Sequence, residues 1–322
     1  MALNGNVPDP VQAAASAGLP VFSARTRLLV VAPHPDDETI ATGMLIQQVR
    51  AVGGEVRVLL LTAGDNNPWP QRWLERRVWI SAVDRQRWGR RRHAEMLEAL
   101  QCLEVPAQAL QSLGWPDMGV TDGLLQSSDA AVAKLAAAIG QFRPSLIAMP
   151  ALGDRHPDHG SAHVLVRLAL AGQMDPPQQL AYMVHGRAPH SGVVEIPGTA
   201  GQAANKRAAL AAHRSQTALS GARMHRLAAR PERYVDLAPK PAGSTSPLPW
   251  RPPAWLWPWL RLSVISPAGT QSWRWPDAPL QRDREGTYRL ALPAVATGPR
   301  FARLASNLPT PWIFDHWGWC EL

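Results

Sequence analysis

Two short strings of residues have the composition to hold a metal ion and to activate water beside it. The first is Ala32-Pro33-His34-Pro35-Asp36-Asp37-Glu38, and the second is Arg155-His156-Pro157-Asp158-His159. Each combines imidazole nitrogen with carboxylate oxygen, a ligand set that suits zinc or a similar divalent first-row metal. Because His, Pro and Asp are also ordinary turn residues, one such string alone is more often a turn than a ligand set. The presence of two favours a metal site.

Both strings follow apolar runs that are typical of buried strands. Residues 27–31 directly precede the first string, and residues 145–149 lie a few residues before the second. Open α/β sheets build their sites in the loops at the carboxyl ends of parallel strands. We therefore expect both strings in such loops.

Strand patterns alternate with helix patterns along most of the chain. Strands are expected at residues 27–32, 56–62, 107–113, 145–149 and 179–185, and helices at residues 39–52, 90–103, 130–142 and 159–171. This alternation predicts an α/β fold with a Rossmann-like, largely parallel sheet and helices on both faces. In the strand order 3-2-1-4-5, the first and fourth strands are neighbours, so the two strings meet at the switch point.

The two strings together resemble the motifs of the PIG-L/LmbE family of zinc-dependent N-deacetylases, which act on N-acetylglucosamine-type sugars. That family has an apolar strand followed by (A/P)HPDDE and, later, HxDH, and both motifs stand intact here. Weaker similarity extends the resemblance over residues 25–238, through Arg92-His93-Ala94-Glu95, Leu113 to Asp117 and Lys206 to Gln216. It implies a metal-dependent hydrolase that removes an N-acetyl or related N-acyl group from an amino-sugar glycolipid or glycoconjugate.

The resemblance also implies which residues hold the metal and which act beside it. His34, Asp37 and His159 would be the ligands of a zinc ion or of another divalent first-row metal. Asp36 would remain free as the general base that acts on water. Amide hydrolysis needs both effects, because a neutral acetamide is a poor electrophile and water is a poor nucleophile near neutral pH.

Four further residues receive roles in the same way. His156, in its protonated form, would stabilise the oxyanion or assist the departing amine, and Asp158 would support catalysis by fixing the tautomer of an imidazole. Arg92 and Asp117 match family positions that bind sugar hydroxyls, although a salt bridge between a helix and a loop would look the same in sequence.

Three nearby features differ from the pattern or resemble a ligand. His163 lies one helical turn after His159, and we interpret it as an additional core or surface histidine. Asp154 stands near the place where some family members have a tyrosine, so acid chemistry depends more heavily on His156. Thr62-Ala63-Gly64-Asp65 replaces the frequent Thr-x-Gly-Glu, with a shorter acidic side chain.

The chain of 322 residues carries a net charge of +8, so its surface attracts anionic partners. Arginines are densest between residues 72 and 92, where tryptophans are interleaved with them, and a solvated helical face explains this run most simply. No specific nucleic acid is expected, because no recognisable nucleic-acid motif accompanies the charge. Since arginine suits phosphate recognition, a charged glycolipid or a nucleotide-sugar remains a possible substrate.

The sequence predicts three segments and a cytoplasmic enzyme. These are a loosely ordered N-terminal segment at 1–25, a deacetylase domain at 26–238 and a Pro/Trp-rich, β-rich extension at 239–322. The extension starts with a linker-like run at 239–247 and has candidate strands at 260–265, 288–292 and 312–317. The two cysteines make no disulfide framework, and neither a secretory signal nor a membrane-spanning stretch is visible.

We expect the extension to tune substrate access or location rather than chemistry. Its cluster of Trp250, Trp255, Trp257 and Trp259 is expected to pack against the catalytic domain, and contact with sugar rings or with the inner membrane surface is the alternative.

A second class of function is a noncatalytic carbohydrate- or membrane-surface-binding protein that retains a metal-stabilised α/β domain. A scaffold has no need of Asp36 and His156 beside a full ligand set, so the motifs favour the enzyme. A two-metal phosphodiesterase would need more ligands than the single set that is visible.

Overall fold

A computed structural model describes residues 21–186, 193–237, 245–291, 298–309 and 313–322 of the chain. The expected loosely ordered start, up to residue 20, and most of the linker-like run lie outside the described residues. No helix within the described ranges is both long enough and apolar enough to cross a membrane.

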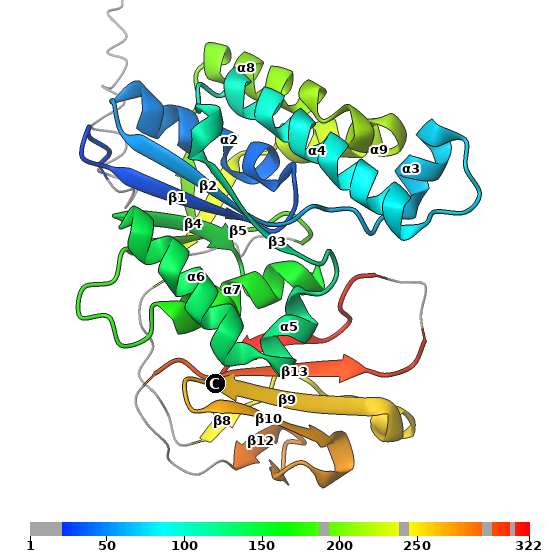
Figure 1. Ribbon diagram of the computed structural model, residues 1–322. Coiled ribbons are helices and arrows are strands. Elements are labelled where there is room, and N and C mark those ends of the chain that lie inside the picture. Colours follow the sequence, from blue (N-terminus) through cyan, green and yellow to red (C-terminus); the bar gives the residue numbers. More distant parts are fainter. Residues whose placement is uncertain (1–20, 187–192, 238–244, 292–297, 310–312) are drawn as a thin grey trace, which may run out of the picture.

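A seven-stranded sheet forms the centre of the α/β region (Figure 1). Its strands run in the order β3-β2-β1-β4-β5-β7-β6. They are β1 (Arg27–Ala32), β2 (Glu55–Thr62), β3 (Leu110–Trp115), β4 (Leu146–Pro150), β5 (Gln178–Tyr182), β6 (Val193–Ile196) and β7 (Glu232–Asp236). The first five are parallel, which confirms the expected fold class and strand order, while β7 and β6 continue the sheet in antiparallel fashion.

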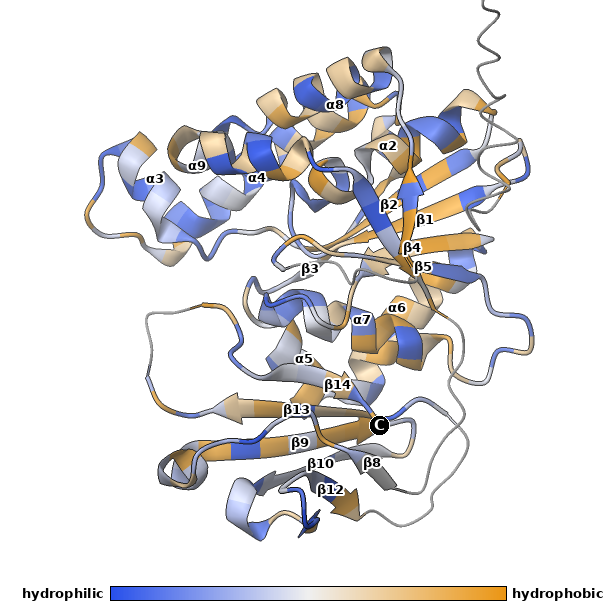
Figure 2. Cartoon of the chain, turned by 180° about the vertical axis from the view of Figure 1, so that it is seen from behind, coloured by the Kyte–Doolittle hydropathy of each residue, from blue (hydrophilic) through white to orange (hydrophobic). Residues whose placement is uncertain are grey.

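Alternation along β1 explains why the sheet is covered on both faces. Leu28 and Val30 belong to one hydrophobic cluster, whereas Leu29 and Val31 belong to another on the opposite face. A strand that is buried on both faces reads as a continuous apolar run, and the central strands are strongly hydrophobic in Figure 2.

Helices pack against each of these two clusters (Figure 1). One face carries α2 (Asp37–Ala51), α4 (Ala82–Cys102), α8 (Ala200–Ala212) and α9 (Arg214–Ala228), with α3 (Pro68–Glu75) beside α9. The other carries α5 (Val120–Gln126), α6 (Ser128–Phe142) and α7 (Pro157–Ala169). The four expected helices are confirmed, but α4 starts eight residues before the expected Arg90. Its early start follows from a capping box between Ser81 and Asp84.

The C-terminal part is β-rich, as expected, and forms two antiparallel sheets with the orders β10-β9-β13-β14 and β11-β12-β8. Its strands are β8 (Thr245–Pro247), β9 (Leu260–Ser266), β10 (Gly269–Arg274), β11 (Leu280–Arg282), β12 (Tyr288–Ala291), β13 (Phe301–Ser306) and β14 (Gly318–Glu321). The four-stranded sheet lies against the layer of α5, α6 and α7, on the side away from the central sheet (Figure 1).

The strand expected at residues 312–317 is wrong, because the last strand is β14 at Gly318–Glu321. The preceding residues form a loop whose polar groups have other partners. Asp315 donates its backbone N–H to the Arg155 carbonyl over 2.8 Å, and its carboxylate forms a 2.6 Å ion pair with Arg303. These contacts draw the loop toward the second of the two metal-type strings.

The expectation for the tryptophan cluster is also wrong. Trp250 is buried in a separate core of the C-terminal part, while Trp255 and Trp259 remain 69% and 43% exposed. The residues that join the α/β core are instead Ile265, Phe301 and Trp319. Hydrophobic periodicity identified these strands but did not reveal which of their faces meets the α/β region.

Close backbone approach strengthens this contact between the two parts. The Trp319 indole N–H donates to the Ser161 hydroxyl of α7 over 3.2 Å. A Cβ atom at Gly160 would lie 2.7 Å from the Trp319 ring, so only glycine allows the indole to approach the first turns of α7.

Candidate metal centre

The sheet brings the two metal-type strings together. β1 and β4 are paired neighbours, with Leu28 opposite Leu146, and one string follows each strand. The first string runs into α2, which begins at Asp37, and the second runs into α7, whose N-cap is His156. The strand–loop–helix order of the sequence therefore places both strings at the same edge of the sheet, as expected from the switch point.

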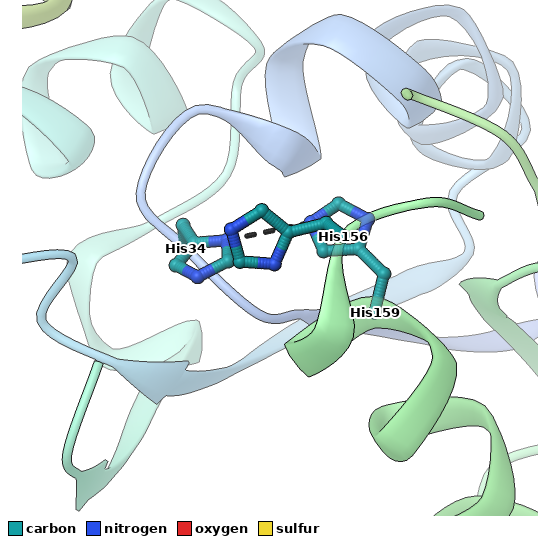
Figure 3. Close-up of side chains that lie close together, drawn as sticks. All are labelled: His34, His156 and His159. Atoms are coloured by element: carbon teal, nitrogen blue, oxygen red, sulfur yellow. Dashed lines mark hydrogen bonds between the residues drawn. The ribbon is translucent and has the colours of Figure 1, made fainter. Parts of the chain in front are cut away.

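His34, Asp37 and His159, here called the metal triad, converge at this edge. His34 Nδ1 lies 3.4 Å from Asp37 Oδ2, His159 Nε2 lies 3.3 Å from the same oxygen, and the two ring nitrogens are 3.3 Å apart. All three residues are buried. Figure 3 shows the close approach of the two imidazoles. Zinc–nitrogen bonds of about 2.0–2.1 Å at tetrahedral angles put neighbouring ligand atoms about 3.3 Å apart, so the triad fits a tetrahedral zinc ion with one position left open.

The electrostatics of the metal triad favour a cation at this place. Burial lowers the pKa of His159, but the carboxylates of Asp37 and Asp154 outweigh burial and raise it to about 10. Burial likewise lowers the pKa of His34, yet Asp117, Asp158 and Asp37 raise it well above the usual range. The carboxylates around the imidazoles thus attract positive charge, whether protons or a divalent metal supplies it.

The outer nitrogen of each triad imidazole lies beside a carboxylate. His159 Nδ1 is 3.3 Å from Asp154 Oδ2, and His34 Nε2 is 3.2 Å from Asp117 Oδ1 and 3.4 Å from Asp158 Oδ2. Such carboxylates fix the orientation and the basicity of metal-binding histidines. Asp158 also accepts hydrogen bonds from the backbone N–H groups of Met118 and Val120, which hold its carboxylate on the outer side of His34.

Asp154, for which the sequence predicted no role, contacts several groups of the site. It accepts hydrogen bonds from the backbone N–H groups of His156, Val184 and His185 at 2.8–3.0 Å, in addition to its place beside His159. The single carboxylate thus ties the β4 loop, the end of β5 and one triad imidazole together. Its position immediately before the second string was the available signal.

Asp36 has a strained backbone and a perturbed carboxyl group. Its φ of 126° lies in a region that non-glycine residues rarely adopt, which costs about 1–3 kcal/mol. Burial raises the pKa of Asp36 to about 6, although the Arg92 guanidinium, 3.3 Å away, opposes this rise. A carboxylate whose pKa lies near neutrality is suited to accept and release protons.

Arg92 and Asp117, the expected sugar-binding residues, line the site but have protein partners. The buried Arg92 guanidinium donates to the carbonyls of Pro35 and Gly64, and Asp117 accepts the Asn66 backbone N–H over 2.7 Å. A Cβ atom at Gly64, whose φ is +61°, would lie 1.9 Å from the Arg92 guanidinium. Both residues thus have protein partners at the edge of the pocket, and their binding of sugar hydroxyls stays a prediction.

His156 lies across the site, but its surroundings do not favour the protonated form that the sequence analysis assumed. Burial and the neighbouring His34 and His159 lower the pKa of His156. The Asp158 backbone N–H donates to His156 Nδ1 over 3.3 Å, so the neutral ring carries its proton on Nε2. His156 is therefore a neutral hydrogen-bond donor, with its ring 4.5 Å from that of His34.

A pocket of about 440 Å³ opens in front of the metal triad. Its walls come from both parts of the chain and include Asp36, His156 and His185 as well as Ile313 and Phe314 of the C-terminal loop. His185 was not among the predicted residues, although it ends the strand expected at 179–185. His163, in contrast, donates from Nδ1 to the Pro150 carbonyl over 2.9 Å and packs on Phe301, which confirms it as a core histidine.

Other groups of three ligand-type side chains overlap the metal triad within the described residues. They are His34 with His156 and His159, Asp37 with His159 and His185, and His34 with Asp117 and Asp158. In the metal triad all three pairs of ligand atoms lie 3.3–3.4 Å apart, and Asp36 precedes the triad's Asp37 in the chain.

Residues 29–170 match the family model described as "PIG-L: GlcNAc-PI de-N-acetylase". A relative from Mycolicibacterium smegmatis, 1D-myo-inositol 2-acetamido-2-deoxy-alpha-D-glucopyranoside deacetylase, is 34% identical over 167 residues, which cover 45% of this chain and 53% of the relative. The protein of the same name from Mycolicibacterium gilvum is 35% identical over 158 residues, which cover 45% of this chain and 54% of the relative. The chain thus spans about half the length of the curated relatives it matches.

One solved structure shows the same fold, and a second is reported beside it. A triple mutant of a deacetylase involved in the teicoplanin biosynthetic pathway has a TM-score of 0.50 at 19% identity, and covers 63% of this chain and 88% of its own. A conserved protein from Thermus thermophilus has a TM-score of 0.49 at 25% identity, and the match covers 67% of this chain and 96% of that protein. The resemblance that the two metal-type strings indicated is confirmed, since residues 29–170 match the PIG-L family model.

Proposed function

We propose that this protein is a zinc-dependent N-deacetylase that acts on an N-acetylated amino-sugar conjugate. One observation carries the proposal: the buried metal triad has tetrahedral ligand separations, and the strained Asp36 carboxylate stands beside it. The names of the two Mycolicibacterium relatives support an acetamido sugar as the substrate class.

When bound by the metal triad, zinc would act as a Lewis acid and lower the pKa of water. Asp36 then accepts a proton from the attacking water, and its raised pKa allows it to pass that proton on to the departing amine. His156 donates a hydrogen bond from Nε2 to the acetamide oxygen as negative charge develops there. Asp154 and Asp158 hold the triad imidazoles in place through their outer nitrogens.

The alternative of a noncatalytic binding protein is less well supported by the same geometry. A strained backbone and a buried carboxyl group both reduce stability, and a metal-stabilised scaffold would gain nothing from Asp36 in this conformation. We assign the chemistry to residues 26–238 and a part of the pocket wall to residues 239–322.

Acetate release tests the proposal directly. Purified protein loaded with zinc should release acetate from N-acetylglucosamine and from N-acetylglucosaminyl-inositol, and a chelator should abolish the release until zinc is restored. The His159→Ala variant should lose both the metal and the activity. His163→Ala, one turn further along α7, is the matched control and should keep near-stoichiometric metal. Equal metal content in His159→Ala and the wild type would contradict the ligand assignment, and no acetate from any N-acetyl sugar would contradict the activity.

A further inference from the structure

A second pocket of about 430 Å³ adjoins the pocket of the metal triad, and arginine dominates its lining. The two pockets share five lining residues, namely Val184, His185, Arg223, Leu227 and Phe314. Four arginines line the second pocket, here called the arginine pocket: Arg155, Arg223, Arg226 and Arg230. A molecule seated at the metal triad could therefore extend into it without leaving the protein surface.

The four arginines come from two separate elements. Arg223 and Arg226 lie in the last turns of α9, Arg230 follows its end, and their spacings of three and four residues put them on one side of the helix. Arg155 belongs to the loop after β4, immediately before His156. Basic side chains are favourable near the C-terminus of a helix, which explains the arginines of α9. This effect does not explain Arg155, which belongs to another element but lines the same pocket.

No carboxylate neutralises this group within the described part of the chain. Arg155, Arg226 and Arg230 form no ion pair there, and Arg223 instead donates to His185 Nδ1 over 3.3 Å and lies over the Phe314 ring. The segments outside the described residues contain only one acidic residue, Asp9. Clustered like charges repel each other unless an anion is bound between them, and guanidinium groups match the geometry of phosphate oxygens.

The arginine pocket is linked to the metal triad through His185. The His185 ring lies 5.1 Å from the His159 ring and 5.5 Å from the His156 ring, and Arg223 contacts its far nitrogen. His185 therefore lies between the metal triad and the Arg223 guanidinium, at the junction of the two pockets. Phe314, stacked near both His185 and Arg223, supplies an apolar wall between them.

We propose that the arginine pocket binds a phosphate group on the non-acetyl side of the substrate, so that the physiological substrate is a phosphorylated N-acetyl amino sugar. This inference rests on the proposed deacetylase function and narrows its substrate class. It differs from what the names of the Mycolicibacterium relatives state, since the inositol glycoside in those names carries no phosphate.

The test compares N-acetylglucosamine 1-phosphate with N-acetylglucosamine as substrates of the zinc-loaded enzyme. The wild type should show a kcat/KM about ten- to a hundredfold higher for the phosphorylated sugar, as expected from two charge-assisted hydrogen bonds. The Arg226→Ala/Arg230→Ala double variant should lose this preference while its kcat/KM for the neutral sugar is unchanged. Arg207→Ala is the matched control and should retain the preference, because Arg207 is an exposed arginine of α8 that forms no ion pair with any residue the structure describes.

Two further substrates distinguish the source of the phosphate. A nucleotide-linked N-acetyl sugar presents it in water, whereas N-acetylglucosaminyl phosphatidylinositol in mixed micelles presents it on a lipid. The double variant should reduce kcat/KM more strongly for the substrate that carries the phosphate in its physiological form. If neither the monophosphate nor these two substrates depends on the arginines, the inference is wrong.

Calorimetric binding separates this inference from the proposed function. If the wild type binds N-acetylglucosamine 1-phosphate and the double variant does not, the anion site is supported even where no acetate is released, and only the deacetylase proposal fails. If both sugars are hydrolysed with equal kcat/KM and the double variant behaves like the wild type, the deacetylase proposal survives and the arginine pocket has no role in binding the substrate.

Discussion

The α/β region and the C-terminal β region bury different kinds of side chains. Between residues 26 and 236 the buried polar groups include carboxylates, imidazoles, an arginine and a lysine, many of them around the metal triad. In the described residues from 245 onward, Ser263 is the single buried polar side chain, and the core is built from Trp, Tyr, Phe and aliphatic residues. Burial of charge is costly unless each group is paired, so its concentration at one sheet edge marks the place where function outweighs stability.

The two regions nevertheless meet at the helix that carries His159. Phe301 and Trp319 of the C-terminal sheet pack in the same cluster as Val164 and Leu165 of α7. The outer side of α7 therefore rests on aromatic side chains, while its first turn faces the metal triad. We infer that the polar region determines activity and that the apolar region supports it through packing.

The largest expected effect is on activity, from a change in the polar region. Asp36→Asn preserves side-chain volume and tolerates the positive φ, but it removes the proton acceptor and should lower kcat by about 10²–10⁴-fold. Metal content and the midpoint of thermal unfolding should stay close to those of the wild type. Unchanged turnover in a zinc-replete Asp36→Asn enzyme would contradict its role as the base.

In the apolar region we expect a substitution to lower stability while activity changes little. Phe301→Ala removes a fully buried ring between β13 and α7 and should reduce the free energy of unfolding by about 3–5 kcal/mol. Urea unfolding measures this loss, and kcat per folded molecule at low temperature should change little. The exposed Trp255→Ala is the control in the same region. If both variants lost the same stability, the aromatic support of α7 would not be specific.

A smaller effect is expected where a carboxylate orients a ligand. Asp154→Asn keeps a hydrogen-bond acceptor for the backbone but weakens the partner of His159 Nδ1, and it should lower zinc affinity about 10–100-fold. Competition with a chromogenic chelator measures the affinity. Asp175→Asn, an exposed residue far along the chain from either string, should bind zinc like the wild type. Equal affinity in the two variants would remove Asp154 from the site.

The smallest effect concerns the one buried polar side chain of the C-terminal core within the described residues. Ser263 Oγ lies 2.6 Å from Ser272 Oγ across paired strands β9 and β10. Ser263→Ala should cost about 0.5–1.5 kcal/mol of unfolding free energy without any change in acetate release. The double variant with Ser272→Ala should cost less than the sum of the single variants, because neither hydroxyl is then left unpaired. Strict additivity would show that the two hydroxyls do not interact.

Local patterns in the sequence were sufficient for the five parallel strands of the central sheet, but they did not predict β6 and β7. Apolar runs at β1, β2 and β4 indicated buried strands, and the alternation with helices gave the parallel order in which β1 and β4 are neighbours. The N-terminal boundary of α4 was missed because the apolar periodicity begins only after its exposed first turns, where a capping box starts the helix. The residues of the metal triad were selected through their resemblance to a family motif, and the structure places these three side chains within 3.3–3.4 Å of one another.

What the sequence by itself determined were the features that depend on neighbours along the chain: the strands, the two strings that follow them and the ligand chemistry those strings contain. Only the tertiary structure decided that Asp154 supports His159, that the guanidinium of Arg92 faces the Pro35 and Gly64 carbonyls, and that His185 joins the site. It also decided that Phe301 and Trp319, rather than the tryptophans near residue 255, meet the α/β region. These contacts join segments far apart in the chain, and their side-chain directions follow from how layers pack, which no local pattern encodes.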